Sequence, residues 1–365
     1  MKGQIPASLA SVPVANSVGG KDSCVRLVQT WRNRRDLRDS YVKLANQVED
    51  EIGLGKLDLP VELLQRNETF FCVERALMVQ VETGLFKAAN PALLQLAQQR
   101  LSRFWADVKP EVQARWALIS SAAEVLIEAE RVGKAIKQAP ATIPALLKAY
   151  TDDDEPWCLL DTHHRNMESR HYSFDFGGSG DHPELEKLIT KAEQRYTEVG
   201  SELAKHFMTA YQKAKPPVKG VLQQREVFEK KVKPLLGDGK VAYVWVDALR
   251  FEMARELSRL LKDDFDLSLQ PAVGTIPTIT EIGMAALLPK ANESAKVVAV
   301  GGGKVALDIG GTVIKDRKDR VAFLRENAGV TVFEAKREDL LPEANEEGEG
   351  RHPGCGVDPH YLPGN

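Results

Sequence analysis

One short stretch constrains the fold of this chain more than any other, because it predicts a buried strand followed at once by an amphipathic helix. Residues 241–246, Val-Ala-Tyr-Val-Trp-Val, are apolar, rich in β-branched and aromatic side chains, and follow a Gly-Asp-Gly turn. Such a run is typical of a strand buried on both faces. Over residues 249–261, leucine and methionine recur at spacings of three and four between charged residues. That spacing predicts a helix with one apolar face, and the pair predicts an α/β fold.

A second junction of the same kind follows closely. Residues 267–273 form another extended pattern, and residues 281–288 have a helical one that Pro289 ends. Asp247 stands after the first predicted strand, and Thr280 directly before the second predicted helix. In an open α/β sheet, ligands bind where strands end and helices begin. The two side chains are therefore candidate site residues.

Asp247 and Thr280 suit one kind of chemistry. A carboxylate can hold a divalent cation, and a threonine beside that cation can lose its proton and act as a nucleophile. Together they make half of a phosphoryl-transfer site. The alternative is structural, since Asp and Thr are both good helix N-caps. From the pattern alone, capping is the more common explanation.

Three motifs in this region resemble the opening of a PglZ domain, a branch of the alkaline phosphatase superfamily. They are Val-Asp-Ala-Leu-Arg at 246–250, Thr-Ile-Pro-Thr-Ile-Thr at 275–280 and Gly-Met-Ala-Ala-Leu-Leu-Pro at 283–289, in that order. The resemblance implies that Asp247 binds a metal and that Thr280 is both nucleophile and metal ligand. Thr278, inside the preceding turn, is the second choice for the nucleophile.

The same resemblance implies a larger protein. Further Asp and His ligands in that superfamily come from later strands, so we expect an incomplete alkaline phosphatase-like sheet, an amino-terminal fragment and no activity in this chain alone. Implied cofactors are divalent metal ions, with zinc first and manganese or magnesium as alternatives. The implied substrate is a phosphate ester or phosphodiester, with a nucleotide or nucleic acid among the candidates. Implied partners are other proteins of bacteriophage exclusion (BREX) defence.

A different class of function fits the long helical region better. It offers a large surface and no obvious catalytic group, which favours a non-catalytic scaffold in a defence or signalling complex. Composition narrows the choice little. The 49 basic and 52 acidic residues give a net charge of −3, so no global positive field favours nucleic acid. No apolar run approaches the roughly 20 residues that span a bilayer, which predicts a cytoplasmic protein without membrane contact.

The predicted organisation is a helical region followed by the start of the catalytic domain. It comprises a tail or linker at 1–22, a helical region at 23–150, a second at 151–236 that leads into the catalytic domain, the amino-terminal part of a PglZ domain at 237–341 and a disordered tail at 342–365. Single helices are predicted at 23–53, 91–108 and 110–139. Later elements are strands at 295–300, 305–309 and 330–333 and a helix at 319–327.

Two clusters invite a metal or phosphate site and are better explained structurally. His163, His164 and His171 lie near Asp161, but their spacing is not one of the usual zinc patterns. We predict an ordinary helix there. Residues 301–304, Gly-Gly-Gly-Lys, lack the spacing of a phosphate-binding loop and predict a hairpin. The four scattered cysteines are interpreted as core or incidental thiols.

Overall fold

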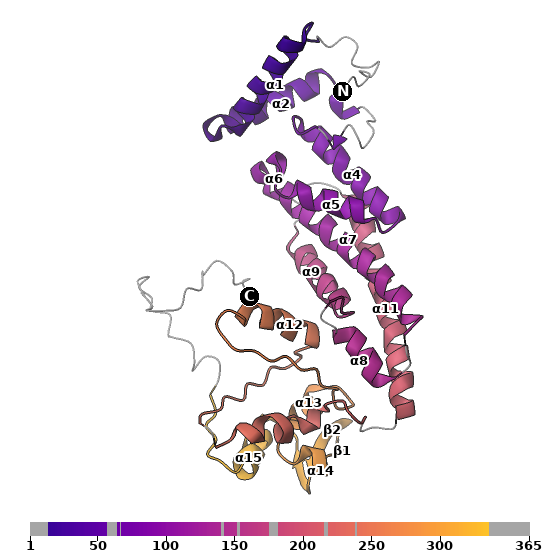
Figure 1. The fold of residues 1–365 in the computed structure, drawn as a ribbon, viewed down its shortest axis with the longest axis vertical. Helices are drawn as coiled ribbons and strands as arrows, with labels where there is room; N and C mark the ends of the chain where they lie inside the picture. The colour runs from indigo at the N-terminus through magenta and orange to yellow at the C-terminus, as the bar shows by residue number, and fades with distance from the viewer. Residues whose placement is uncertain are drawn as a thin grey trace, which may run out of the picture. The chain divides into compact units, whose positions relative to one another are not determined.

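The computed structural model describes residues 14–56, 64–65, 67–139, 142–151, 154–174, 182–214, 218–237 and 239–335. These residues form two compact units (Figure 1). The first, the helical unit, comprises residues 1–221 and 249–271; the second, the sheet unit, comprises residues 222–248 and 272–365. Within the described ranges, no helix is both long and apolar enough to span a bilayer.

The helical unit is built around α7, a long helix with an almost continuous buried face. Helices α4, α5, α9 and α11 pack against it or against one another. The bounds of the helices in this unit are α1 Val18–Asn33, α2 Arg38–Glu51, α4 Phe71–Lys87, α5 Pro91–Arg100, α6 Phe104–Val108, α7 Pro110–Ile136, α8 Ile143–Thr151, α9 Leu159–Ser173, α11 Pro183–Ala214 and α12 Phe251–Leu261. The predicted all-helical character of residues 23–150 is confirmed over the residues described.

Two predicted helices in this unit have different bounds. The helix expected at 23–53 begins at Val18, where Ser17 accepts a hydrogen bond from the Gly20 N–H at 3.1 Å, and it is interrupted at Arg34, which is extended. The tail prediction is therefore wrong for residues 18–22, and its residues 1–13 lie outside the described part. The helix expected at 91–108 is split between α5 and α6.

The core of the helical unit contains paired charges as well as aromatic rings. Trp105 and Trp116 are buried, and the Trp116 indole N–H donates to Glu74 at 2.7 Å. Arg115 of α7 donates two hydrogen bonds to Glu82 of α4, each 2.8 Å long. A bidentate pair of this kind satisfies both partners in a region that excludes water.

The sheet unit contains three antiparallel strands in the order β1, β2, β3. They are β1 Lys296–Gly301, β2 Lys304–Ile309 and β3 Thr312–Ile314, so two of the predicted strands are confirmed and β3 was not predicted. Gly301, Gly302 and Gly303 all have positive φ in the turn between β1 and β2. Three successive residues adopt this backbone readily only when they are glycine, and the predicted hairpin is confirmed.

Short helices cover one face of this sheet. They are α13 Thr280–Ala285, α14 Ala291–Ser294 and α15 Arg317–Asn327. A small apolar core joins them to the strands, made by Ile282, Ala285, Ala286, Leu288, Ala291, Leu307, Ile309, Ile314 and Phe323. The helix predicted at 319–327 is thus confirmed, with a start two residues earlier, where Asp316 caps it by accepting the Asp319 N–H at 3.0 Å.

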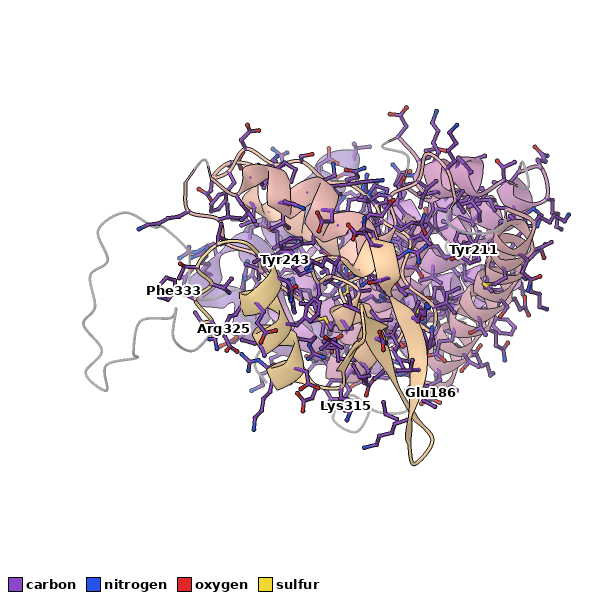
Figure 2. The ribbon with its side chains drawn as sticks, turned by 90° about the horizontal axis from the view of Figure 1, so that it is seen from below. Glu186, Tyr211, Tyr243, Lys315, Arg325 and Phe333 are labelled. Atoms are coloured by element: carbon purple, nitrogen blue, oxygen red, sulfur yellow. The ribbon has the colours of Figure 1, made fainter. Side chains whose placement is uncertain are left out.

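Three predicted strands do not form. Residues 241–246, 267–273 and 330–333 are extended or irregular, and the only ladder contact among them in the described chain is an isolated bridge between Gln223 and Val273. A strand needs the backbone groups of a neighbour, and none of the described residues supplies them. Phe333 is 91% exposed (Figure 2), and Val244 is 76% exposed. The α/β prediction is therefore met only in part, by a mostly helical chain with one small antiparallel sheet.

Candidate functional site

Asp247 is placed by the extended segment that precedes it. Side chains alternate in such a segment, so residues 243, 245 and 247 share one side. The Tyr243 hydroxyl (Figure 2) donates to the Leu287 carbonyl at 3.1 Å, and Trp245 packs against the apolar core. Because both aromatic rings face the helices of the sheet unit, Asp247 points toward the same helices. Burial of the Tyr243 ring also raises the pKa of its hydroxyl.

The turn after this segment is unusual. Ala248 has φ of +55°, in the left-handed region that a non-glycine residue seldom adopts. The Asp247 carboxylate accepts the Ala248 N–H at 2.9 Å, which holds the turn and orients the carboxylate at the end of the segment. Backbone strain of this type is found disproportionately at functional sites.

Thr280 is placed by a helix anchored in the core. It is the first residue of α13, and Ile282 and Ala285 on the same helix are buried against the sheet. The Gly283 N–H donates to the Ile279 carbonyl at 2.8 Å, which closes the first turn. Thr280 itself is exposed. Thr280 is thus an exposed residue on a helix that is anchored by buried side chains.

The structure brings the two predicted site residues together. Thr280 Oγ1 lies 3.1 Å from Asp247 Oδ2 and 3.4 Å from Oδ1, so the hydroxyl donates to the carboxylate across 33 residues of sequence. Neither side chain caps a helix. The N-cap of α12 is Arg250 and that of α13 is Ile279, and neither makes a side-chain capping bond. The capping interpretation, which the pattern alone favoured, is therefore wrong.

The donor atoms of this pair fit part of a cation site. Carboxylate and hydroxyl oxygens are the ligands that hard divalent cations prefer. Over the residues described, no group of three or more His, Cys, Asp or Glu side chains is arranged to hold a metal ion. The pair thus offers two ligands where a zinc site needs about four, and the coordination set is incomplete in this part of the chain.

Thr278, the second choice for the nucleophile, occupies a different position. It lies in the turn before α13, beside Gly274, and is exposed. No hydrogen bond between Thr278 and Asp247 occurs in the described structure. Geometry therefore distinguishes two threonines that the sequence places only two residues apart.

Gln224 is a residue near the site that sequence reasoning missed. Its Oε1 accepts the Thr275 N–H at 3.0 Å, and its own N–H donates to the Val273 carbonyl at 2.9 Å. Nothing in the local sequence marks it, because a glutamine at the start of a polar helix is ordinary. Only the contact with a loop about fifty residues away reveals its role.

The histidines of α9 take part in structural contacts, as predicted. His164 stacks on Tyr196 with ring centroids 3.7 Å apart, and His163 lies 3.5 Å from Glu124. Asp161 accepts hydrogen bonds from the hydroxyls of Tyr150 at 2.6 Å and Tyr196 at 2.8 Å. Burial lowers the pKa of the His164 imidazole.

A comparison with protein families finds a match in the same region that carries the candidate site. Residues 227–305, which include Asp247 and Thr280, match the BREX system PglZ alkaline phosphatase-like domain. The chain is 25% identical over 349 residues to the alkaline phosphatase-like protein BrxZ of Escherichia coli O9:H4 (strain HS), a match that covers 90% of this chain and 38% of BrxZ. It is 26% identical over 273 residues to the alkaline phosphatase-like protein PglZ of Bacillus cereus (strain H3081.97), covering 70% of this chain and 30% of that protein.

These matches confirm the predicted resemblance to PglZ-domain proteins. The chain spans well under half the length of both relatives. No solved structure matches it.

Proposed function

We propose that this homologue of BREX PglZ proteins carries the opening part of a metal-dependent phosphoesterase site, with Asp247 and Thr280 as ligands of one divalent cation and Thr280 as the nucleophile. The observation that carries the proposal is the 3.1 Å contact between Thr280 Oγ1 and Asp247 Oδ2. Two oxygens at this separation can serve one cation when the hydroxyl hydrogen is removed. Both residues are exposed and so open to a substrate.

A bound cation would lower the pKa of a coordinated hydroxyl and offset the charge of a phosphate group. The residues of this chain would hold and orient the reacting atoms. The core contacts of α13 keep Thr280 in place, and the Ala248 N–H holds one oxygen of Asp247. Thr280 Oγ1 would form the new bond to phosphorus as the ester oxygen leaves. The hydroxyl proton would pass to solvent, because the Asp247 carboxylate is engaged as a ligand, and the ester oxygen would leave with the bonding electron pair.

The described residues supply only two ligands, so we propose that catalysis requires further ligands and that this chain by itself does not turn over a substrate. The predicted zinc, manganese or magnesium preference, the phosphate ester or phosphodiester substrate and a cytoplasmic location belong to this proposal. BREX membership of the relatives further suggests other defence proteins as partners.

A second candidate function is a non-catalytic scaffold. The helical unit supports it, because its helices bury an extensive core and leave apolar side chains such as Leu257 and Leu260 of α12 exposed, at 45% and 73%. Exposed apolar residues on a strongly amphipathic helix are typical of surfaces that contact another chain. The two candidates differ in one respect, since a scaffold needs neither Asp247 nor Thr280.

The experiment is a Mn²⁺ titration of this chain followed by electron paramagnetic resonance. We expect weak binding, with a Kd on the order of 1 mM, because few ligands are available. Thr280→Val, which keeps the side-chain shape and removes the hydroxyl, and Asp247→Asn are expected to abolish it. Thr280→Ser restores the hydroxyl and is expected to retain it.

Thr278→Val is the matched control, because it removes a neighbouring hydroxyl that does not touch Asp247. Loss of Mn²⁺ binding in Thr278→Val but not in Thr280→Val would show that Thr278, and not Thr280, is the ligand. Equal binding by all variants would refute the metal site and favour the scaffold. The same substitutions in a relative of full length, assayed with an aryl phosphodiester, test the nucleophile: Thr280→Val at the corresponding position is expected to remove hydrolysis.

A further inference from the structure

The loop that ends at Thr280 is tied to a distant segment of the sheet unit. The Val273 N–H donates to the Leu222 carbonyl, and the Gln224 N–H donates to the Val273 carbonyl, each at 2.9 Å. These two bonds make a short parallel bridge that fixes the start of the loop. From there only six residues lead to Thr280. The position of the loop start therefore limits where the threonine can lie.

The side chain of Gln224 lies close to the chain both before and after Thr280. Its Oε1 accepts the Thr275 N–H at 3.0 Å, on the side of the loop before Thr280. Its amide also lies against Gly283, in the first turn of α13 after Thr280, where an added Cβ would be 3.4 Å from Nε2 and 3.8 Å from Oε1. One half-buried side chain is thus hydrogen-bonded to the segment before the threonine and lies close to the segment after it. No described residue other than Gln224 accepts the Thr275 N–H.

The backbone of Gln224 is itself well anchored. It begins a 3-10 helix whose first turn is closed by a reciprocal capping arrangement between Gln223 and Glu226. The following residues include Phe228, which is buried and lies 6.3 Å, between ring centroids, from Tyr243. The same short segment is thereby linked to the extended chain that carries Asp247.

We infer that Gln224 is the positioning residue of this site, and that its side-chain oxygen keeps Thr280 within hydrogen-bonding reach of Asp247. Gln224 touches neither side chain of the pair. It acts through the loop, by removing freedom that Thr275 and α13 would otherwise have. The inference rests on the proposed function only where it concerns a cation. The restraint of the loop by Gln224 does not depend on that function.

The test compares Gln224→Met with Gln224→Glu in the full chain, by amide hydrogen exchange and by Mn²⁺ binding. Methionine has a similar length and no strong acceptor, so we expect exchange at the Thr275 amide and over residues 280–283 to become about fivefold faster. Mn²⁺ binding is expected to weaken about tenfold, because the apparent affinity falls with the fraction of molecules in which Thr280 lies within reach of Asp247. Glutamate keeps an acceptor oxygen and is expected to restore the protection at Thr275.

Gln98→Met is the matched control, since it removes one exposed side-chain hydrogen bond, to Glu124 at 3.2 Å, in the helical unit. It is expected to leave both measurements unchanged. Unchanged exchange at Thr275 in Gln224→Met would overturn the inference. So would faster exchange with unaltered Mn²⁺ binding, provided that Asp247→Asn abolishes binding. If Asp247→Asn does not change Mn²⁺ binding, the proposed function fails. Amide exchange at Thr275 alone then tests whether Gln224 restrains the loop.

Discussion

The helical unit and the sheet unit differ in what they bury. Among the described residues, every buried charged side chain belongs to the helical unit, where Arg115 meets Glu82 and Trp116 meets Glu74. The apolar core between the sheet and its short helices consists of aliphatic side chains and Phe323. The candidate site lies on the smaller unit, exposed and held by a few hydrogen bonds. The buried charges and the candidate site thus lie in different units of the chain.

This difference has a physical basis. A large helical core can exclude water from an ion pair and satisfy it, and the pair then makes one packing arrangement much better than its alternatives. An unpaired charge would unfold a small core, because the core buries too little apolar surface to offset the free energy lost when the charge leaves water. We therefore expect substitutions of buried charges to act on the helical unit, and small changes of apolar volume to act on the sheet unit.

The largest expected effect is that of Arg115→Met. It leaves Glu82 buried without its bidentate partner, and we expect the helical unit to lose about 3–5 kcal/mol of unfolding free energy. Urea denaturation followed by circular dichroism at 222 nm measures it. Adding Glu82→Leu should recover most of the loss, because the unpaired charge is then gone. Lys134→Met, which breaks an exposed pair with Glu130, should cost less than about 1 kcal/mol.

If Arg115→Met lowered the unfolding free energy no more than Lys134→Met, the proposed difference between buried and exposed charges would be refuted. Cysteine labelling gives an independent measurement, because the described cysteines all lie in the helical unit. Burial raises the pKa of the Cys158 thiol to about 11, and that of Cys72 to about 12, so both react slowly with alkylating agents at neutral pH. Arg115→Met should speed the labelling of Cys158.

A smaller effect is expected for Ile309→Val in the sheet unit. Removing one methylene group from the core beside Phe323 should cost about 0.5–1.5 kcal/mol. The measurement is amide exchange over β2 and α13, which should become faster. Exchange in α7 should not change, because α7 belongs to the other unit. Equal acceleration in both places would show that the units unfold together.

The smallest effect is a pH dependence within the helical unit. Glu252 of α12 is 1% exposed, and burial, followed by the nearby charge of Asp161, raises the pKa of its carboxyl. Arg250, whose Nε lies 2.8 Å from Oε1, and Arg165 act in the opposite direction. A raised folded-state pKa means that the contribution to stability is complete below the usual value near 4.5 and is lost as pH rises through the folded value.

Glu252→Gln should remove this dependence. The difference in unfolding free energy between the variant and the natural chain, measured by urea denaturation from pH 4 to pH 8, is expected to favour the variant increasingly as pH rises. A difference that stays constant over this range would show that the Glu252 carboxyl titrates as an exposed group does. The sheet unit has no buried acidic side chain among its described residues and should show no corresponding trend.

Much of the helical unit was predictable, because helices depend on local periodicity. The buried face of α7 follows the spacing of Trp116, Ile119 and Ala123, and α5, α7 and α11 each begin at a proline. The break at Arg34 was not predicted, although the apolar spacing is interrupted there between Trp31 and Leu37. The histidines of α9 were correctly interpreted as structural, although their partners Tyr196 and Glu124 come from helices distant in sequence.

The sequence by itself determined which residues are candidates at the site. Asp247 and Thr280 stand in recognisable motifs, and residues 301–303 could form a tight turn because they are glycine. Tertiary structure decided the rest. Residues 241–246 have the composition of a strand, but a strand exists only when a neighbour supplies backbone partners, and composition cannot provide a neighbour. The contact of Thr280 with Asp247, and the hold of Gln224 on the loop between them, join segments 33 and about 50 residues apart. Such distances are set by the packing of whole elements, which local residue patterns do not encode.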